Sequence, residues 1–174
     1  MIETTVEEVE LVGSDGVTTG TCPKLDAHLA PGLRHRAVSV VLFDGADRTL
    51  LQRRAPATYH FANRWSNACC THPRPDEEPR SAAQRRLIEE MGITLELAEI
   101  GTFLYRAEDP VSGLVENEYD HVFVGTFTGS PLPEGRIVSD WTWAGITELH
   151  QRLAADPTSY TPWLPFVLDI AASA

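Results

Sequence analysis

A single helical pattern, residues 79–91, lies between two groups of strand patterns and constrains the fold more than any other feature. Pro79 stands at its first position, Ala83, Leu87 and Met91 share one face, and Gly92 follows its last residue. Strands that enclose one central helix, with further helices at the end of the chain, are typical of a sandwich that mixes helices and a sheet.

The strand patterns occur on both sides of that helix. Residues 36–43 (RAVSVVLF) are the clearest, and the turn DGAD joins them to residues 49–53 as a hairpin. Further strands are expected over residues 3–12, 17–19, 98–105, 119–127 and 137–143, and helices over residues 146–155 and from 162 to the end. The predicted class is therefore an α/β (α+β) sandwich, a mixed sheet flanked by helices, with N-terminal strand and C-terminal helix additions.

The length of the chain bounds its number of domains, and its net charge limits the kinds of ligand that it can bind. The chain has 174 residues, which suits one domain, and a formal net charge of −11. This excess of carboxylates excludes a general electrostatic attraction to nucleic acid or to an anionic membrane, and an anionic small ligand would need local cations. No run approaches the roughly 20 apolar residues that span a bilayer, and no signal peptide pattern opens the chain, so we expect a cytoplasmic protein.

Residues 55–78 are rich in Pro, His, Cys and Asn and follow no clean period. A stretch of this length is too long for an idle loop, so we expect it to be functional. Its adjacent Cys69 and Cys70, with Cys22 elsewhere, make three cysteines that we expect to be reduced. Cys70, two residues before His72, is a candidate proton donor or nucleophile, although spacing alone does not separate it from Cys69.

Two groups of carboxylates suggest a bound cation. In RRLIEEMGI, the pairs Arg85–Glu89 and Arg86–Glu90 can each meet on the helix surface, and solvated surface pairs are the ordinary interpretation. However, both glutamates lie at the C-terminal end, where the helix dipole disfavours anions, so a nearby cation is favoured.

The second group is ENE, residues 116–118. In an extended strand Glu116 and Glu118 share a face and repel, which a divalent cation would relieve. A polar loop edge is the commoner fate of such a tripeptide.

The histidines could complete a metal site. His28, His35 and His72 are the best candidates, His60 and His121 adjoin functional-looking segments, and His150 fits an ordinary surface residue. Imidazoles with carboxylates suit first-row divalent metals, whereas an all-oxygen site suits Mg²⁺. The side-by-side cysteines do not match a structural zinc site.

Together these motifs resemble a known family. RRLIEEMGI is similar to the second half of the Nudix signature, with Glu77 at its upstream glutamate. Two positions differ from the Nudix hydrolases, because Thr71 replaces a glycine and Arg86 replaces a metal-binding glutamate. These departures, with SNACCTHP (66–73) and GLVENE (113–118), resemble the type I isopentenyl-diphosphate isomerases over about residues 24–163.

The resemblance implies a single Nudix-type sandwich domain over residues 1–174 that interconverts isopentenyl and dimethylallyl diphosphate by moving a proton across a double bond. It implies a catalytic pair, Cys70 and Glu118, with Tyr105 beside the glutamate. The remaining implied roles are a metal site of His28, His35, His72, Glu116 and Glu118; Glu90 near a diphosphate-bound Mg²⁺; the diphosphate-binding cations Lys24, Arg54 and Arg86; and Trp163 lining the hydrocarbon pocket. The His/Glu site would take Mn²⁺ or Mg²⁺, and such ligands also accept Zn²⁺.

Three alternatives stay open at this stage. Thr58 stands where the family often has a lysine, which leaves room for a different prenyl diphosphate as substrate. A Nudix hydrolase of nucleoside diphosphate derivatives is disfavoured by Arg86. A metal-stabilised protein that binds a prenyl diphosphate without turnover is the third. We expect a small-molecule partner, no nucleic acid or membrane, and a monomer or small homo-oligomer.

Overall fold

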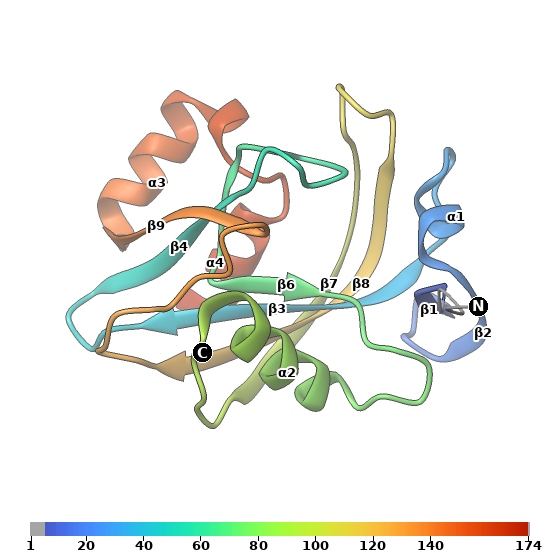
Figure 1. Cartoon of the computed structure of the whole chain (residues 1–174), viewed down its shortest axis with the longest axis horizontal. Coiled ribbons are helices and arrows are strands. Elements are labelled where there is room, and N and C mark those ends of the chain that lie inside the picture. Colours follow the sequence, from blue (N-terminus) through green and yellow to red (C-terminus); the bar gives the residue numbers. More distant parts are fainter. Residues whose placement is uncertain (1–5, 174) are drawn as a thin grey trace.

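The computed structural model describes residues 6–173 and contains one nine-stranded sheet with helices packed on it (Figure 1). The strands are β1 (Glu8–Val12), β2 (Thr18–Pro23), β3 (His35–Phe43), β4 (Arg48–Arg54), β5 (Trp65–Ser66), β6 (Cys69–Thr71), β7 (Ala98–Glu108), β8 (Val115–Thr126) and β9 (Val138–Gly145). The helices are α1 (Lys24–His28), α2 (Pro79–Met91), α3 (Ile146–Ala155) and α4 (Leu164–Ala172), with a 3₁₀ turn at Pro157–Ser159.

Strand β3 is the centre of the sheet. It pairs in parallel with β8 along its whole length, from His35 opposite Glu118 to Phe43 opposite Thr126. Along the other edge of β3 lie β1, β6 and β4 in turn, all antiparallel to it. The sheet is therefore mixed, as the sequence predicts.

Alternation along β3 forms two apolar layers, because successive side chains point to opposite faces. Val38, Val40 and Leu42 pack in one cluster with Leu87 and Met91 of α2. Val41 packs in another cluster with residues of β8 and of α4. Helices α3 and α4 pack against β4 and β9, away from α2 (Figure 1). The predicted sandwich is confirmed.

Most predicted elements are confirmed. Helices 79–91 and 146–155 have the predicted bounds, and strand 36–43 begins only one residue earlier. The strand predicted from residue 119 starts at Val115, because its pairing with β3 and β7 overrides the polar character of ENE.

The differences lie in short elements and at the ends. Pattern analysis missed α1, β5 and β6, which are too short for any period to show. The strand predicted over residues 3–12 begins at Glu8, with residues 3–5 outside the described part, and the one predicted over 17–19 runs on to Pro23. Helix α4 begins at Leu164, two residues after the predicted start. Across residues 6–173, the helices are all too short or too polar to cross a bilayer.

The packing of α2 makes a first prediction. Leu87 is fully buried, whereas its neighbour Ile88 is 48% exposed. Leu87→Ala should lower the free energy of unfolding by about 2–5 kcal/mol, because it leaves a cavity beneath the sheet. Ile88→Ala should change it by no more than about 0.5 kcal/mol. Urea unfolding of both variants measures the difference, and equal losses would contradict this packing.

Candidate active site

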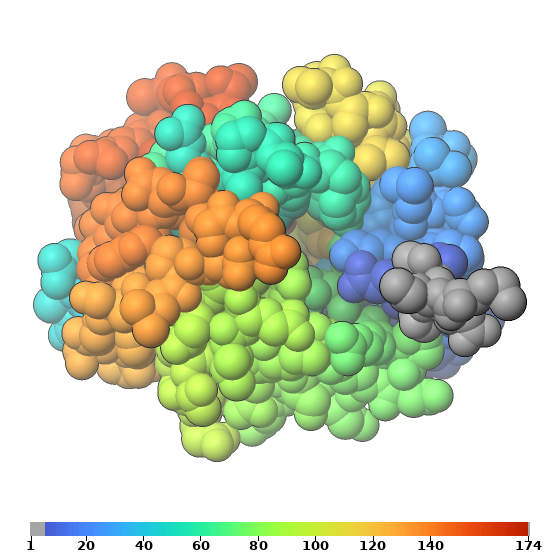
Figure 2. All heavy atoms as spheres, viewed as in Figure 1, coloured from blue at the N-terminus to red at the C-terminus, as the bar shows by residue number. Residues whose placement is uncertain are grey.

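A pocket gathers most of the predicted site residues. It opens where residues 55–65, α2 and the N-terminal segment with α1 meet, and Figure 2 shows a hollow there. Its lining includes Lys24, Arg54, Thr58, Cys70, His72, Arg86, Glu90, Tyr105, Glu116, Glu118 and Trp163. His28 and His35 are fully buried behind this lining, in contact with Glu116.

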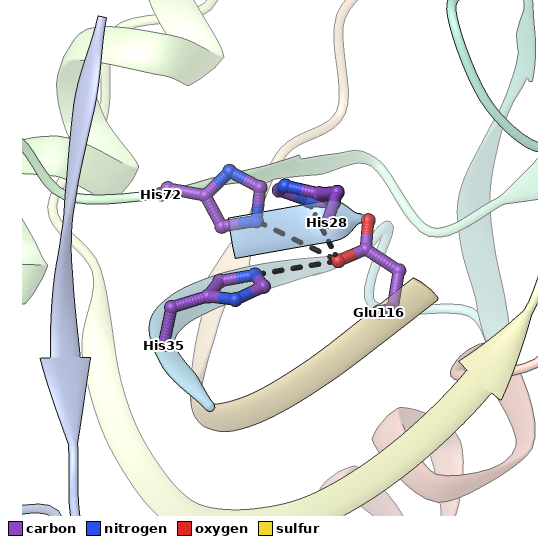
Figure 3. A group of neighbouring side chains, drawn as sticks. All are labelled: His28, His35, His72 and Glu116. Carbon is purple, nitrogen blue, oxygen red and sulfur yellow. Dashed lines mark ion pairs between the residues drawn. The ribbon is translucent and has the colours of Figure 1, made fainter. Parts of the chain in front are cut away.

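Three histidines converge on one oxygen of Glu116 (Figure 3). The Nε2 atoms of His28, His35 and His72 lie 3.0, 3.4 and 3.8 Å from Glu116 Oε2. All four residues are buried, and one ligand atom from each lies within 4.8 Å of the others. Four separate segments supply them, namely the end of α1, the start of β3, the residue after β6, and β8.

Hydrogen bonds elsewhere on two of the rings make this convergence chemically informative. His28 Nδ1 donates to the Lys24 carbonyl at 2.6 Å, and His35 Nδ1 donates to the Leu33 carbonyl at 2.8 Å. In a neutral ring each Nε2 then carries a lone pair, and that lone pair faces an acceptor-only carboxylate. Within residues 6–173, neither Nε2 nor Glu116 Oε2 has a hydrogen-bond partner. A positive charge is needed between them.

Either a proton or a metal ion can supply that charge. Burial alone would lower the pKa of His35, but hydrogen bonds to Glu116 and Glu118 outweigh it and raise that pKa to about 10. A divalent cation would replace the proton. Three imidazole nitrogens and a carboxylate are a donor set that first-row metals accept, and orientation of two rings by backbone carbonyls is usual for metal-binding histidines. The residues fit a metal ion.

Glu118 lies at the edge of this group. Its Oε1 atom is 2.9 Å from His72 Nε2 and 3.7 Å from His35 Nε2. Tyr105 on β7 is its partner across the sheet. Burial and the neighbouring charge of Glu116 raise the pKa of Glu118 to about 7, so this carboxyl can hold or release a proton near neutrality.

The structure separates the two adjacent cysteines. Because side chains alternate along β6, Cys69 packs in the cluster beneath α2, while Cys70 lines the pocket. The Cys70 thiol donates to Asn67 Oδ1 at 3.1 Å and lies 3.5 Å from the Ser39 hydroxyl. Burial and the charge of Asp120 raise the pKa of Cys70 to about 12, which keeps the thiol protonated.

Trp163 is held in place by the same polar cluster. Its Nε1 donates to Ser66 Oγ at 3.1 Å and to Asn67 Oδ1 at 3.2 Å, and 3% of the residue is exposed. The Arg54 guanidinium lies 5.6 Å from the centre of the Trp163 ring. The indole therefore forms a fixed apolar wall beside Cys70 and Arg54.

The two glutamates at the end of α2 have different surroundings. Glu90 is buried, 2.8 Å from Arg86 Nε, and accepts from Gln52 Nε2 at 2.8 Å. Glu89 is more exposed and makes the surface pairs with Arg85 and Arg86. Solvated pairing thus describes Glu89, whereas Glu90 faces the pocket.

Two further positions named from the sequence are placed by the fold. Glu77 pairs with Arg85 at 2.7 Å and is not part of the pocket lining. Thr58 does line the pocket.

Several pocket residues were missed from the sequence. Asp120, which accepts from the Ser39 hydroxyl at 2.7 Å, continues the two-residue period of Glu116 and Glu118 and could have been found that way. His60, whose role the sequence left open, contacts Glu116 and is buried. Ser39 and Gln52 carry no local signal, because only the tertiary fold brings them to the pocket.

Comparisons with known proteins agree with this geometry. The family profile described as NUDIX domain matches residues 33–164. Isopentenyl-diphosphate Delta-isomerase of Nocardia farcinica is 48% identical, with 95% of each chain covered, and the protein of that name from Streptomyces griseus is 48% identical over 95% of this chain and 84% of its own length.

Solved structures share the fold at low identity. A protein of Deinococcus radiodurans superposes with a TM-score of 0.75 at 17% identity, covering 95% of this chain and 98% of its own. The MutT protein of Methanosarcina mazei superposes with a TM-score of 0.65 at 16% identity, covering 80% and 94%. With the profile match and the relatives at 48% identity, this chain belongs to the Nudix family and, within it, to the isopentenyl-diphosphate Delta-isomerases.

Proposed function

We propose that this protein is a metal-dependent isomerase that interconverts isopentenyl diphosphate and dimethylallyl diphosphate. The observation that carries the proposal is the placement of the Cys70 thiol and the Glu118 carboxyl in one pocket, beside the group of three histidines and Glu116 that fits a metal ion. The names of the relatives support the same reaction. We treat residues 1–174 as one domain and expect the reaction in the cytoplasm.

The reaction needs an acid and a base around one alkene. Protonation of the terminal =CH₂ carbon of isopentenyl diphosphate gives a tertiary carbocation at the branched carbon. Loss of a proton from the neighbouring CH₂ group on the diphosphate side then completes the isomerisation. Cys70 lies on β6 and Glu118 on β8, the strands on either side of β3, so the two groups reach the pocket from opposite sides of that strand. We assign them the two proton transfers, with Tyr105 beside Glu118. General acid–base catalysis of this kind typically contributes about 10²–10⁴-fold.

The carbocation must be stabilised and kept from water. Trp163 presents an aromatic face, and a cation over such a face gains about 2 kcal/mol when it is desolvated. The Ser66 and Asn67 hydrogen bonds hold that ring in place. A closed apolar wall also excludes the water that would trap the carbocation as an alcohol.

The diphosphate would bind at the charged end of the pocket. Lys24, Arg54 and Arg86 supply cations there, and Glu90 would hold the Mg²⁺ of the diphosphate. Mn²⁺, Mg²⁺ or Zn²⁺ in the His28/His35/His72/Glu116 group, with Glu118 as a further ligand, would supply fixed positive charge beside the catalytic carboxylate. The Nε2 atom of His72 also lies 2.9 Å from Glu118 Oε1, so this histidine contacts both glutamates.

Arg86 also weighs against the hydrolase alternative. A Nudix hydrolase would need a metal-binding glutamate at this position, but here the Arg86 guanidinium pairs with Glu90 on the pocket wall. Thr58, which stands where the family often has a lysine, lines the pocket. A different prenyl diphosphate therefore remains the second candidate substrate.

The reaction itself is the first test. Purified protein with Mg²⁺ and Mn²⁺ should convert isopentenyl diphosphate to dimethylallyl diphosphate, followed by NMR, and should release no phosphate from a panel of nucleoside diphosphate derivatives. Longer prenyl diphosphates should react more slowly. Absence of isomerisation, or phosphate release from a nucleotide, would overturn the proposal.

The two cysteines give a matched pair of variants. Cys70→Ala should lower kcat at least about 10²-fold, because it removes a proton-transfer group. Cys69→Ala should leave kcat within a few-fold of the wild type, because Cys69 faces the core beneath α2. Similar kcat losses in steady-state assays of both variants would contradict the assigned roles.

Metal binding should be visible in thermal stability. Mn²⁺ at about 100 times its dissociation constant should stabilise the metal-stripped protein by about 2.7 kcal/mol. Because the metal displaces the proton on His35, whose pKa is raised to about 10, affinity and stabilisation should both fall from pH 8 to pH 6. Calorimetry with and without Mn²⁺ measures this.

Two histidine variants control that measurement. His28→Ala should abolish the Mn²⁺-dependent shift, whereas His150→Ala should retain it, since the His150 ring is exposed and donates to the Ile146 carbonyl. A Mn²⁺ shift that survives in His28→Ala would place the ion elsewhere.

A further inference from the structure

A fourth histidine, His60, contacts the metal-binding carboxylate from its other side. Its Nε2 lies against Glu116 Oε1, whereas His28, His35 and His72 face Oε2. His60 is 4% exposed, and it lies outside the four-residue group whose ligand atoms are mutually within 4.8 Å. His60 therefore contacts Oε1, the oxygen of Glu116 that the other three histidines do not face.

The proton positions distinguish His60 from two of the ligand histidines. His28 and His35 use their Nδ1–H groups on backbone carbonyls, so their Nε2 atoms carry lone pairs in the neutral ring. Within the described residues, His60 Nδ1 has no hydrogen-bond partner. A neutral His60 can therefore carry its proton on Nε2 and donate it to Glu116, which accepts only.

His72 shares the unpartnered Nδ1, but its position differs. Its Nε2 lies 2.9 Å from Glu118 Oε1 and belongs to the group of converging ligand atoms. His60 is the histidine whose ring nitrogen meets the opposite oxygen of Glu116. His60 and His72 thus differ in which oxygen of Glu116 their Nε2 atoms face.

The backbone around His60 holds the ring firmly. The His60 carbonyl accepts from Arg54 Nη2 at 3.1 Å, and the next amide, Phe61 N, donates to Asp109 Oδ2 at 3.1 Å. Phe61 has a φ of 45°, in the left-handed region that bulky residues rarely adopt. The His60 ring itself packs edge-on against His28, with 5.5 Å between centroids.

We propose that His60 is a positioning residue for the metal site, which donates a hydrogen bond from Nε2 to Glu116 Oε1 and thereby turns Oε2 toward His28, His35 and His72. This role deepens the proposed function, because it rests on metal binding at that group. With Oε1 engaged, Glu116 offers the metal one oxygen rather than two. Partners of this kind typically change metal affinity by about 10- to 100-fold.

The test is the Mn²⁺ affinity of the metal-stripped full-length chain, measured from the signal of free Mn²⁺ in electron paramagnetic resonance. His60→Ala should weaken affinity about 10- to 100-fold. His60→Gln, whose amide N–H can still donate, should retain most of it. His121→Ala is the matched control, because His121 also pairs with a glutamate, Glu99, at 2.6 Å but does not line the pocket, and its affinity should equal the wild type's.

The Co²⁺ absorption spectrum distinguishes positioning from ligation. At saturating Co²⁺, His60→Ala should keep the wild-type visible spectrum, because no ligand is lost, and isomerase activity should recover as metal is raised. A changed spectrum would make His60 a ligand and overturn the positioning role, as would wild-type affinity in His60→Ala.

Two controls keep the result interpretable. Circular dichroism without metal reports whether each variant folds, and His60→Leu, which fills the space of the ring without a donor, replaces His60→Ala if the latter does not fold. Failure of the wild type to bind Mn²⁺ would overturn the metal site and this role together. Failure of the isomerase assay with normal Mn²⁺ binding would overturn the proposed reaction alone.

Discussion

The parallel pairing of β3 with β8 is the constraint on which the rest of this site depends. It sets His35 opposite Glu118 and continues without a shift to Phe43 opposite Thr126. In such a ladder a slip of one residue would turn every side chain of a strand to the other face. That slip would move Glu116, Glu118 and Asp120 out of the pocket and Val122 out of the core. The apolar ends of both strands therefore fix the register in which the polar ends meet.

This register creates a costly concentration of charge. Glu116, Glu118 and Asp120 are all buried on one face of β8, and Glu90 is buried across the pocket. Burial of ionised carboxylates is tolerated only where cations or donors compensate them. Around Glu116 the compensation comes from histidines, and around Glu90 it comes from Arg86 and Gln52. The excess of negative charge in the whole chain is thus partly a property of this pocket, because these buried carboxylates line it.

Different parts of the chain were predictable for different reasons. Long elements with a clear period, such as α2 and β3, followed from the sequence because each repeats its apolar pattern over several turns or pleats. Elements of two to five residues, such as α1 and β6, were missed, although they carry His28 and Cys70. Strand β6 owes its conformation to pairing with β3, and α1 to packing against β1, β2 and β8, which leaves no local pattern.

By itself the sequence determined the class of fold, the central helix and, through SNACCTHP and GLVENE, a family resemblance that named nearly all of the proposed site residues. The tertiary structure decided what spacing along the chain left open: Cys70 lines the pocket while Cys69 packs in the core, and Glu90 rather than Glu89 faces the pocket. It also showed that His60, Ser39 and Gln52 line the pocket. The physical reason is the reach of the interactions. Periodicity and capping act between neighbours in the chain, whereas hydrogen bonds such as that between Gln52 and Glu90, 38 residues apart, exist only once the sheet has closed around the pocket.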